Sequence, residues 1–407
     1  MLISQLLIYR GLAALALACA AAMAARFPVQ ATALWIALVE TTPEQWRSGW
    51  AETVIGAEKA VGLMLVLLLG LRFGFRRDRY NPGFAFAAVF VTGLLHGLYP
   101  GLTLMSSLRS LIGSAAPFAF GFARTGPAFR RMVTVMVMLG PLINLAAGLV
   151  LSLRHIHPLY MMSGGAFRLG GAGLPAFLGG FALIAIYAGL FEIIRAEESG
   201  EIPWLAYPLL GVNLVVLLLS GARAPLVLAG ALLFGTALLR RRLVLFAAAG
   251  ALVCAVILFA GQFGFIRAVN LLQGGDAEDL SNRNLIWPYF EAAIRASPWL
   301  GWGAGAGKQI VPADTGVAAL IGTNAAHNEY LRIGCEGGVL GLGLLVLCMA
   351  LWTYRGSGNL PRAQRWFMRL VLLAFAVHSA TDNTLIATTS SVLFIWISAV
   401  FGAAAMP

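Results

Sequence analysis

The chain has 407 residues and a formal net charge of +11; 60% of its residues are hydrophobic and only 11% are charged. Its mean hydropathy is +0.84. Soluble domains are about 45–50% apolar and about 25% charged, so a soluble globular protein is excluded because its surface could not be covered. The composition predicts an α-helical protein in a lipid bilayer, where each helix satisfies its own backbone hydrogen bonds.

The apolar runs set the predicted fold. A helix needs about 20 apolar residues to cross a bilayer, and the hydropathy pattern indicates an all-α, polytopic bundle of about twelve transmembrane helices. The apolar stretch 29–40 is too short to cross and is predicted to be interfacial or re-entrant. The predicted spans are 5–25, 54–75, 84–100, 103–123, 132–152, 174–194, 203–220, 223–239, 243–262, 330–353, 366–381 and 385–405.

The arginines predict the orientation. They gather in the loops after the second, fourth, eighth and tenth spans, which all fall on one side, and the positive-inside rule makes that side cytoplasmic. Both termini are then cytoplasmic, and an uncleaved first span is favoured over a signal peptide because removing it would reverse the count. Nucleic-acid binding is not expected, since the arginines lie in short loops. These arginines are Arg72, Arg76, Arg77, Arg79, Arg124, Arg130, Arg131, Arg240, Arg241, Arg242, Arg355, Arg362 and Arg365.

One loop is much longer than most of the others. Residues 264–329 separate the first nine predicted spans (1–263) from the last three (330–407), and the count of spans places this loop outside the cytoplasm. Long loops are usually functional, and this one is expected to contain helices, with an amphipathic helix at 284–295. No separate soluble domain is predicted, so the chain is one membrane-embedded unit. The four cysteines form no CxxC pair, and neither a disulfide framework nor a zinc site is indicated.

The outer end of the tenth span carries the sharpest polar motif, Asn324-Ala-Ala-His327-Asn328-Glu329-Tyr330-Leu331. We expect Asn324 to cap a helix with His327 in its first turn. A neutral imidazole there can act as a base near physiological pH. A histidine that only caps the helix or binds a lipid headgroup is the alternative.

Arginines are the next candidates, because the planar guanidinium suits bidentate binding of phosphate. Arg223 lies at the outer end of the eighth span, and Arg283 precedes the predicted amphipathic helix. Snorkelling to lipid phosphate and an ordinary surface charge are their alternatives. His378 and Asp382 are four residues apart and are expected on one helix face, where the carboxylate could orient a base or bind a cation, or form only a local hydrogen bond.

One tempting match fails. Residues 301–308 look like a phosphate-binding loop, but Trp302 and Gln309 stand where the motif requires glycine and Ser or Thr. We expect a close-packed turn instead. The chain has no HExxH, DxD or Cys/His cluster, so no metal is expected.

Four segments together resemble the O-antigen ligase family, whose superfamily also contains O-antigen polymerases and some protein oligosaccharyltransferases. They are 283–287 (RNLIW), 297–303 (SPWLGWG), 327–331 (HNEYL) and 336–341 (EGGVLG). The family shares a multi-span topology with a large periplasmic loop before the last spans. The motif resemblance covers roughly residues 219–340.

The resemblance implies a membrane-embedded, GT-C-like, inverting glycosyltransferase that needs neither metal nor cofactor. The donor would be a glycan on undecaprenyl diphosphate, the acceptor a sugar hydroxyl of lipid A–core, and the active site would face the periplasm from the inner membrane, in contact with membrane lipids. The family's arginines match Arg223 and Arg283, its histidine matches His327, and its late aspartate matches Asp382. The remaining residues expected to contact substrate are Arg154, Arg295, Asn328, Tyr330 and His378.

Other functions stay open at this point. An O-antigen polymerase would use the same donor with another lipid-linked glycan as acceptor, and a protein oligosaccharyltransferase would use a protein. A lipid or glycan transporter would also need broken helices and intramembrane charges, but the inverted repeat typical of that class is not seen. A purely structural scaffold would have no need for a histidine and several arginines on one face of the membrane.

Overall fold

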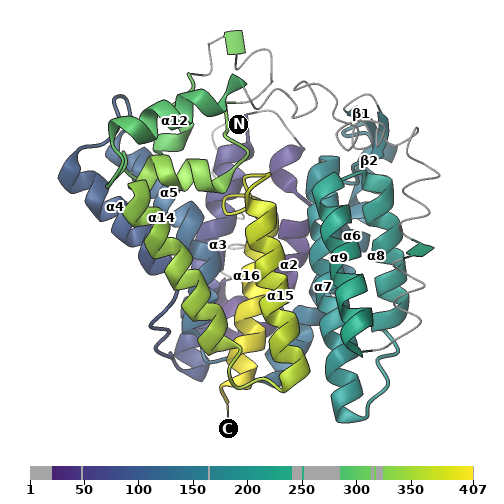
Figure 1. Ribbon diagram of the computed structural model, residues 1–407. Coiled ribbons are helices and arrows are strands. Elements are labelled where there is room, and N and C mark those ends of the chain that lie inside the picture. The colour runs from purple at the N-terminus through teal and green to yellow at the C-terminus, as the bar shows by residue number, and fades with distance from the viewer. Residues whose placement is uncertain are drawn as a thin grey trace, which may run out of the picture.

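The structure, a computed structural model, describes residues 21–46, 49–163, 166–240, 250–251, 285–312, 316–317 and 324–406. Within these ranges the chain is a helical bundle with one short antiparallel hairpin at its upper end (Figure 1). The all-α class is confirmed, with that hairpin as a minor addition.

Ten predicted spans coincide with described helices or with a helix pair, and the predicted spans 5–25 and 243–262 fall mostly outside the described residues. Bounds agree to within a few residues, and the predicted span 103–123 consists of an α-helix continued by a 3₁₀ helix. The elements are α2 (Pro28–Glu40), η1 (Pro43–Gln45), α3 (Ala51–Phe73), α4 (Gly83–His96), α5 (Leu104–Ala115), η2 (Ala116–Phe122), α6 (Pro127–Leu153), β1 (Tyr160–Ser163), β2 (Ala166–Leu169), α7 (Pro175–Ser199), α8 (Ala206–Ser220), α9 (Arg223–Arg240), α12 (Trp287–Ala296), η5 (Ala306–Lys308), α14 (Glu329–Gly356), α15 (Arg362–Ser379) and α16 (Thr388–Ala404).

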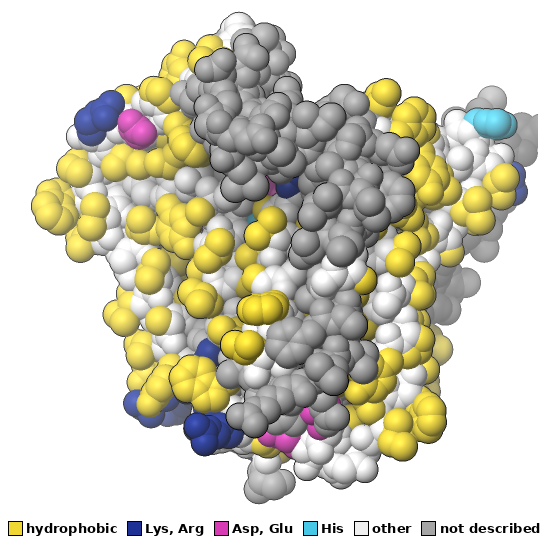
Figure 2. Space-filling view, turned by 45° about the vertical axis from the view of Figure 1, so that its right-hand side comes forward, with side chains coloured by type: hydrophobic (Ala, Val, Ile, Leu, Met, Phe, Trp, Pro, Cys, Tyr) yellow, Lys and Arg dark blue, Asp and Glu magenta, His cyan; other side chains and the backbone are white. Residues whose placement is uncertain are grey.

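Four described helices, α3, α6, α7 and α14, are long and apolar enough to cross a membrane, and α4, α8, α9 and α16 are shorter apolar helices. Large hydrophobic side chains such as Leu71, Leu95 and Val227 are exposed on the sides of the bundle. Hydrophobic side chains likewise cover much of the face in Figure 2, with charged ones toward its ends. Such a surface is stable in lipid, so the chain is an integral membrane protein.

Two helices form the centre of the bundle. Helix α7 is buried over most of its length, and nearly every residue of α16 is buried. They approach closely at Gly180, where an added Cβ would lie 2.8 Å from Thr389. This approach places the N-terminal ends of both helices together.

The prediction that residues 29–40 form an interfacial or re-entrant piece is wrong. Helix α2 packs inside the bundle against α3, α6 and α16, with Trp35, Ile36 and Val39 buried. Just before α2, the carbonyl of Arg26 accepts a hydrogen bond from Arg72 at the end of α3. The predicted span 5–25 would have left Arg26 at the opposite end. Tertiary packing, not length, decides the position of this helix.

The arginine-bearing loops meet at one end of the bundle. A β-bridge joins Phe75 to Ala123, the Arg76 guanidinium donates to the carbonyl of Phe401, and Arg355 lies over the ring of Tyr80. The N-termini of α9, α14 and α16 lie at the other end, beneath α12 and the hairpin (Figure 1). The bundle therefore separates its arginine-rich loops from its other polar loops.

The described part of the long loop packs on α14. Helix α12 confirms the predicted amphipathic helix, with Phe290 buried in a small cluster that also holds Cys335 of α14. Residues 301–308 form the expected turn. At Gly301, where φ is +67°, an added Cβ would come within 2.5 Å of the α14 backbone. Glycine is thus required for the close approach of this turn to α14.

Candidate functional site

The predicted polar residues converge on a cavity of about 810 Å³ at the end of the bundle opposite the arginine loops. Helices α7, α9, α15 and α16, the hairpin and the loop 380–387 form its walls. The polar side chains among its lining residues are Arg168, Tyr187, Arg223, His327, His378, Thr381, Asp382, Asn383, Thr384, Thr389 and Ser390.

His327 is held by the residues on both sides of it. The carbonyl of Ala326 accepts a 3.0 Å hydrogen bond from the indole of Trp287. Asn328 is the N-cap of α14, and its Oδ1 accepts from the N–H groups of Tyr330 and Leu331. His327 itself has φ of +47°, a left-handed conformation that is unfavourable for a residue with a Cβ. Such strain is characteristic of functional sites, where the surrounding structure imposes it.

The prediction that Asn324 caps the helix is therefore wrong. Asn324 donates to the carbonyl of Lys308 instead, and α14 begins five residues later, at Glu329. His327 precedes the helix and does not lie in its first turn. The cap forms at Asn328 because its side chain, in extended backbone, can reach the two free N–H groups of the first turn.

Asp382 contacts His327. Nδ1 of His327 and Oδ1 of Asp382 are 3.2 Å apart, and both side chains are partly exposed to the cavity. Burial alone would raise the pKa of Asp382, but hydrogen bonds from His327 and the N–H of Asn383, with the nearby imidazoles of His327 and His378, hold this pKa below its usual value. The carboxylate stays charged and can orient the imidazole.

The expectation that His378 and Asp382 share one helix face is wrong. Helix α15 ends at Ser379, and Asp382 lies in the following loop. Both side chains nevertheless line the cavity. The helix ends early because residues 380–387 turn back toward α16, and this turn carries Asp382 to His327.

Two arginines line the same cavity. Arg223 is the first residue of α9, directly after the turn at Gly221 that ends α8. Arg168 of β2 donates from Nε to the carbonyl of Ser220, at 2.7 Å. Burial and then the charge of Arg223 lower the pKa of Arg168. Two neighbouring cations in a partly enclosed site favour an anion between them.

Arg168 was missed as a site residue. The sequence places it in an outer loop with Arg154, and nothing in the local pattern separates the two. The structure does: Arg154 is the exposed C-cap of α6, whereas Arg168 points toward the turn between α8 and α9. The hairpin strands have only four residues each, too few for an alternating pattern to predict which way Arg168 points.

The other predicted residues have different positions. Arg295 is exposed on α12, 70% of its side chain being accessible, with Glu291 at 3.7 Å. Arg283 lies outside the described residues, so its contact with substrate stays a prediction. Asn328 acts as a helix cap next to the cavity, and Tyr330 donates from its hydroxyl to the carbonyl of Ala376.

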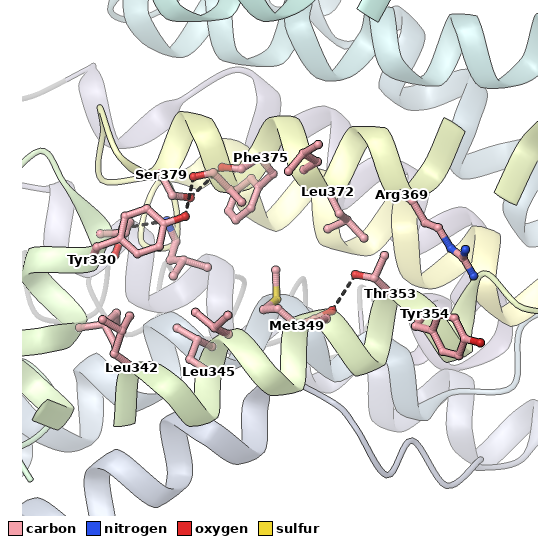
Figure 3. Close-up of a pocket in the computed structure, with 17 residues that line it drawn as sticks. Tyr330, Leu342, Leu345, Met349, Thr353, Tyr354, Arg369, Leu372, Phe375 and Ser379 are labelled. Atoms are coloured by element: carbon pink, nitrogen blue, oxygen red, sulfur yellow. Dashed lines mark hydrogen bonds between the residues drawn. The ribbon is translucent and has the colours of Figure 1, made fainter. Parts of the chain in front are cut away.

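An apolar groove of about 470 Å³ runs between α14 and α15 (Figure 3). Tyr330 and Ser379 stand at one end, and Arg369, stacked over Tyr354, stands at the other. Phe375 lines both the groove and the cavity. Tyr330 thus faces the groove, on the side of α14 turned to α15.

Residues 208–346 match the model of a protein family described as O-antigen ligase. The match includes α8, α9, α12 and most of α14, and therefore Arg223 and His327, but it ends before Asp382 and begins after Arg168. No curated protein matches the sequence. This segment is therefore similar to a family whose members are glycosyltransferases that use lipid-linked glycans and include ligases and polymerases.

Proposed function

We propose that the protein is an O-antigen ligase, which transfers a glycan from undecaprenyl diphosphate to a sugar hydroxyl of lipid A–core. The observation that carries the proposal is that a paired histidine and carboxylate share one cavity with two adjacent arginines. Inverting glycosyl transfer needs one group near the attacking hydroxyl and others near the departing diphosphate. The family match over residues 208–346 supports the same chemistry.

The arginines serve the leaving group. When the anomeric C–O bond breaks, the bonding electrons pass to the diphosphate oxygen and negative charge grows there. Arg168 and Arg223 are preorganised to stabilise this charge, because the Ser220 carbonyl fixes the former and the start of α9 fixes the latter. Arg283 is the third candidate, and its contribution rests on the family motif.

The histidine serves the acceptor. In the tautomer in which Nδ1–H donates to Asp382, Nε2 of His327 keeps its lone pair for the acceptor hydroxyl. As the hydroxyl oxygen bonds to the anomeric carbon, its proton passes to Nε2, and Asp382 stabilises the imidazolium. Attack from the face opposite the departing diphosphate inverts the anomeric configuration.

We further propose that this cavity faces the periplasm from the inner membrane. The arginine-bearing loops gather at the other end of the bundle. By the positive-inside rule that end is cytoplasmic. This orientation matches the side on which lipid-linked O-antigen and lipid A–core meet.

The test is a transfer assay with purified protein, undecaprenyl-diphosphate glycan, EDTA and no ATP. Lipid A–core, a second lipid-linked glycan and a protein acceptor are supplied separately. Glycan appearing on lipid A–core is the expected result. Longer chains on the lipid donor alone would identify a polymerase, glycan on protein would identify an oligosaccharyltransferase, and no product with any acceptor would refute transferase activity.

The site assignment has its own test. His327→Ala should reduce transfer by about 10²–10⁴-fold, the usual contribution of general acid–base catalysis. Exposed His155, in an outer loop away from the cavity lining, provides the matched control as His155→Ala. Equal transfer by the two variants, at equal amounts of folded protein, would contradict the role of His327.

A further inference from the structure

Three charged side chains form a buried network at the beginning of α14. Arg332 donates from Nε to Oε2 of Glu329 at 2.6 Å and from Nη1 to Oε2 of Glu336 at 3.1 Å. Their side chains are only 7%, 2% and 3% exposed, respectively. An added Cβ at Gly307 would lie 2.9 Å from Cγ of Arg332, so the η5 turn covers the network.

Glu329 makes one more contact, which reaches the loop 380–387 that carries Asp382. Its second carboxylate oxygen, Oε1, accepts a 2.8 Å hydrogen bond from the backbone N–H of Leu385. Leu385 is three residues after Asp382, and Glu329 is two residues after His327. A single buried carboxylate therefore links the segment that carries the histidine to the loop that carries its aspartate partner.

Stability alone is a weak reason for this network. A buried ion network loses hydration free energy that its attractions recover only in part, and apolar replacements of such networks are often neutral or stabilising. A carboxylate that accepts hydrogen bonds on both oxygens does, however, fix two backbone segments at one distance. No neutral side chain of the same size has two acceptor oxygens, since glutamine has one.

We infer that Glu329 is a positioning residue, which holds the loop 380–387 against the start of α14 and so sets the contact between Asp382 and His327. Its catalytic consequence rests on the proposed function, but its effect on the loop does not. Arg332 orients the carboxylate through Oε2, and the N–H of Leu385 binds its other oxygen, Oε1. Ser379 and Thr384, bonded at 2.6 Å, hold the beginning of the same loop to α15.

The network offers a matched pair of variants. Glu329→Gln and Glu336→Gln each remove one negative charge from the same arginine at nearly constant volume. Only Glu329→Gln removes a carboxylate that also accepts a hydrogen bond from the loop 380–387, at Leu385. We expect Glu329→Gln to lower kcat about 10- to 100-fold, because small displacements of catalytic groups cost about this much. The KM for the lipid donor should change little, since Arg168 and Arg223 are untouched, and Glu336→Gln should stay close to wild type.

Two readouts separate positioning from folding. Amide hydrogen exchange in 380–387 should become faster in Glu329→Gln and stay unchanged in Glu336→Gln. Combined with Asp382→Asn, Glu329→Gln should cause little additional loss, since residues that act through one another are non-additive. If Glu329→Gln does not fold, Glu329→Asp, which keeps the charge but shortens the reach, replaces it.

The outcomes are distinct. Unchanged exchange and unchanged kcat in folded Glu329→Gln would overturn the inference. So would equal losses in the two glutamine variants, which would indicate a merely structural network. If the wild-type protein transfers glycan to no acceptor, the proposed function fails, and the exchange measurement alone still decides whether Glu329 holds the loop.

Discussion

At the scale of single residues, the structure distinguishes Arg168 from Arg154, two arginines of the same outer loop that the sequence could not tell apart. Arg168 borders the cavity with Arg223, whereas Arg154 is exposed at the end of α6. A hydrogen bond to a charged group contributes about 1.5–3 kcal/mol. Loss of Arg168 should therefore weaken transfer from a diphosphate donor more than loss of Arg154 does.

We predict that Arg168→Gln lowers kcat/KM for the lipid donor about 10- to 100-fold. Arg154→Gln, the matched control, should leave it nearly unchanged. Initial rates at several donor concentrations with purified variants measure both. An equal effect of the two substitutions would show that the diphosphate does not bind beside Arg168.

Asp382 gives a prediction about pH. Its pKa is lowered, so the stabilisation it provides is complete above the unfolded value of about 3.9 and is lost only as pH falls through the lower folded value. Asp382→Asn should accordingly reduce transfer by about 10²-fold or more, and it should lower the free energy of unfolding by an amount that does not shrink between about pH 8 and pH 5. Unfolding of wild type and variant in detergent across this range tests the second effect. A stability difference that shrinks steadily toward pH 5 would mean that the carboxylate titrates there and that its pKa is not lowered.

At the scale of elements, the start of α14 decides where the histidine stands. Asn328 caps the helix, and this leaves His327 outside it in a left-handed conformation. The indole of Trp287 holds the preceding carbonyl. A helix beginning three or four residues earlier would have placed His327 inside its first turn, in helical backbone and not in the left-handed conformation observed.

We predict that Asn328→Ala lowers the free energy of unfolding by about 0.5–2 kcal/mol, the usual effect of losing an N-cap. It should also reduce transfer, because His327 loses its support. Asn324→Ala, which removes only an exposed hydrogen bond to Lys308, is the control. Thermal unfolding in detergent and the transfer assay measure the two effects. Greater destabilisation by Asn324→Ala would restore that residue as the cap.

At the scale of the whole molecule, the bundle places loops far apart in sequence at the same end. The N-termini of α9, α14 and α16 bring the cavity together from three parts of the chain. Helices α7 and α16 both line the cavity, at the place where Gly180 and Thr389 approach each other closely. The cavity therefore exists because the N-terminal ends of these helices lie at the same end of the bundle.

The orientation of the bundle is testable by labelling from outside the cell. In a chain whose native cysteines are replaced, Arg154→Cys should react with a membrane-impermeant maleimide in intact spheroplasts. Arg77→Cys, equally exposed but in an arginine-bearing loop, should react only after permeabilisation, because that loop is predicted to be cytoplasmic. The reverse pattern would invert the topology and contradict a periplasmic site.

Sequence alone was enough to predict the membrane class, the bounds of most described helices and the motif around His327. These follow from hydropathy and local residue patterns, which depend on near neighbours along the chain. The predictions of an interfacial or re-entrant α2, of a helix cap at Asn324 and of one helix face shared by His378 and Asp382 are wrong, and Arg168 was not selected. These points depend on which distant segment packs against the residue: α6 against α2, the loop 380–387 against α14, and β2 against the turn that precedes Arg223.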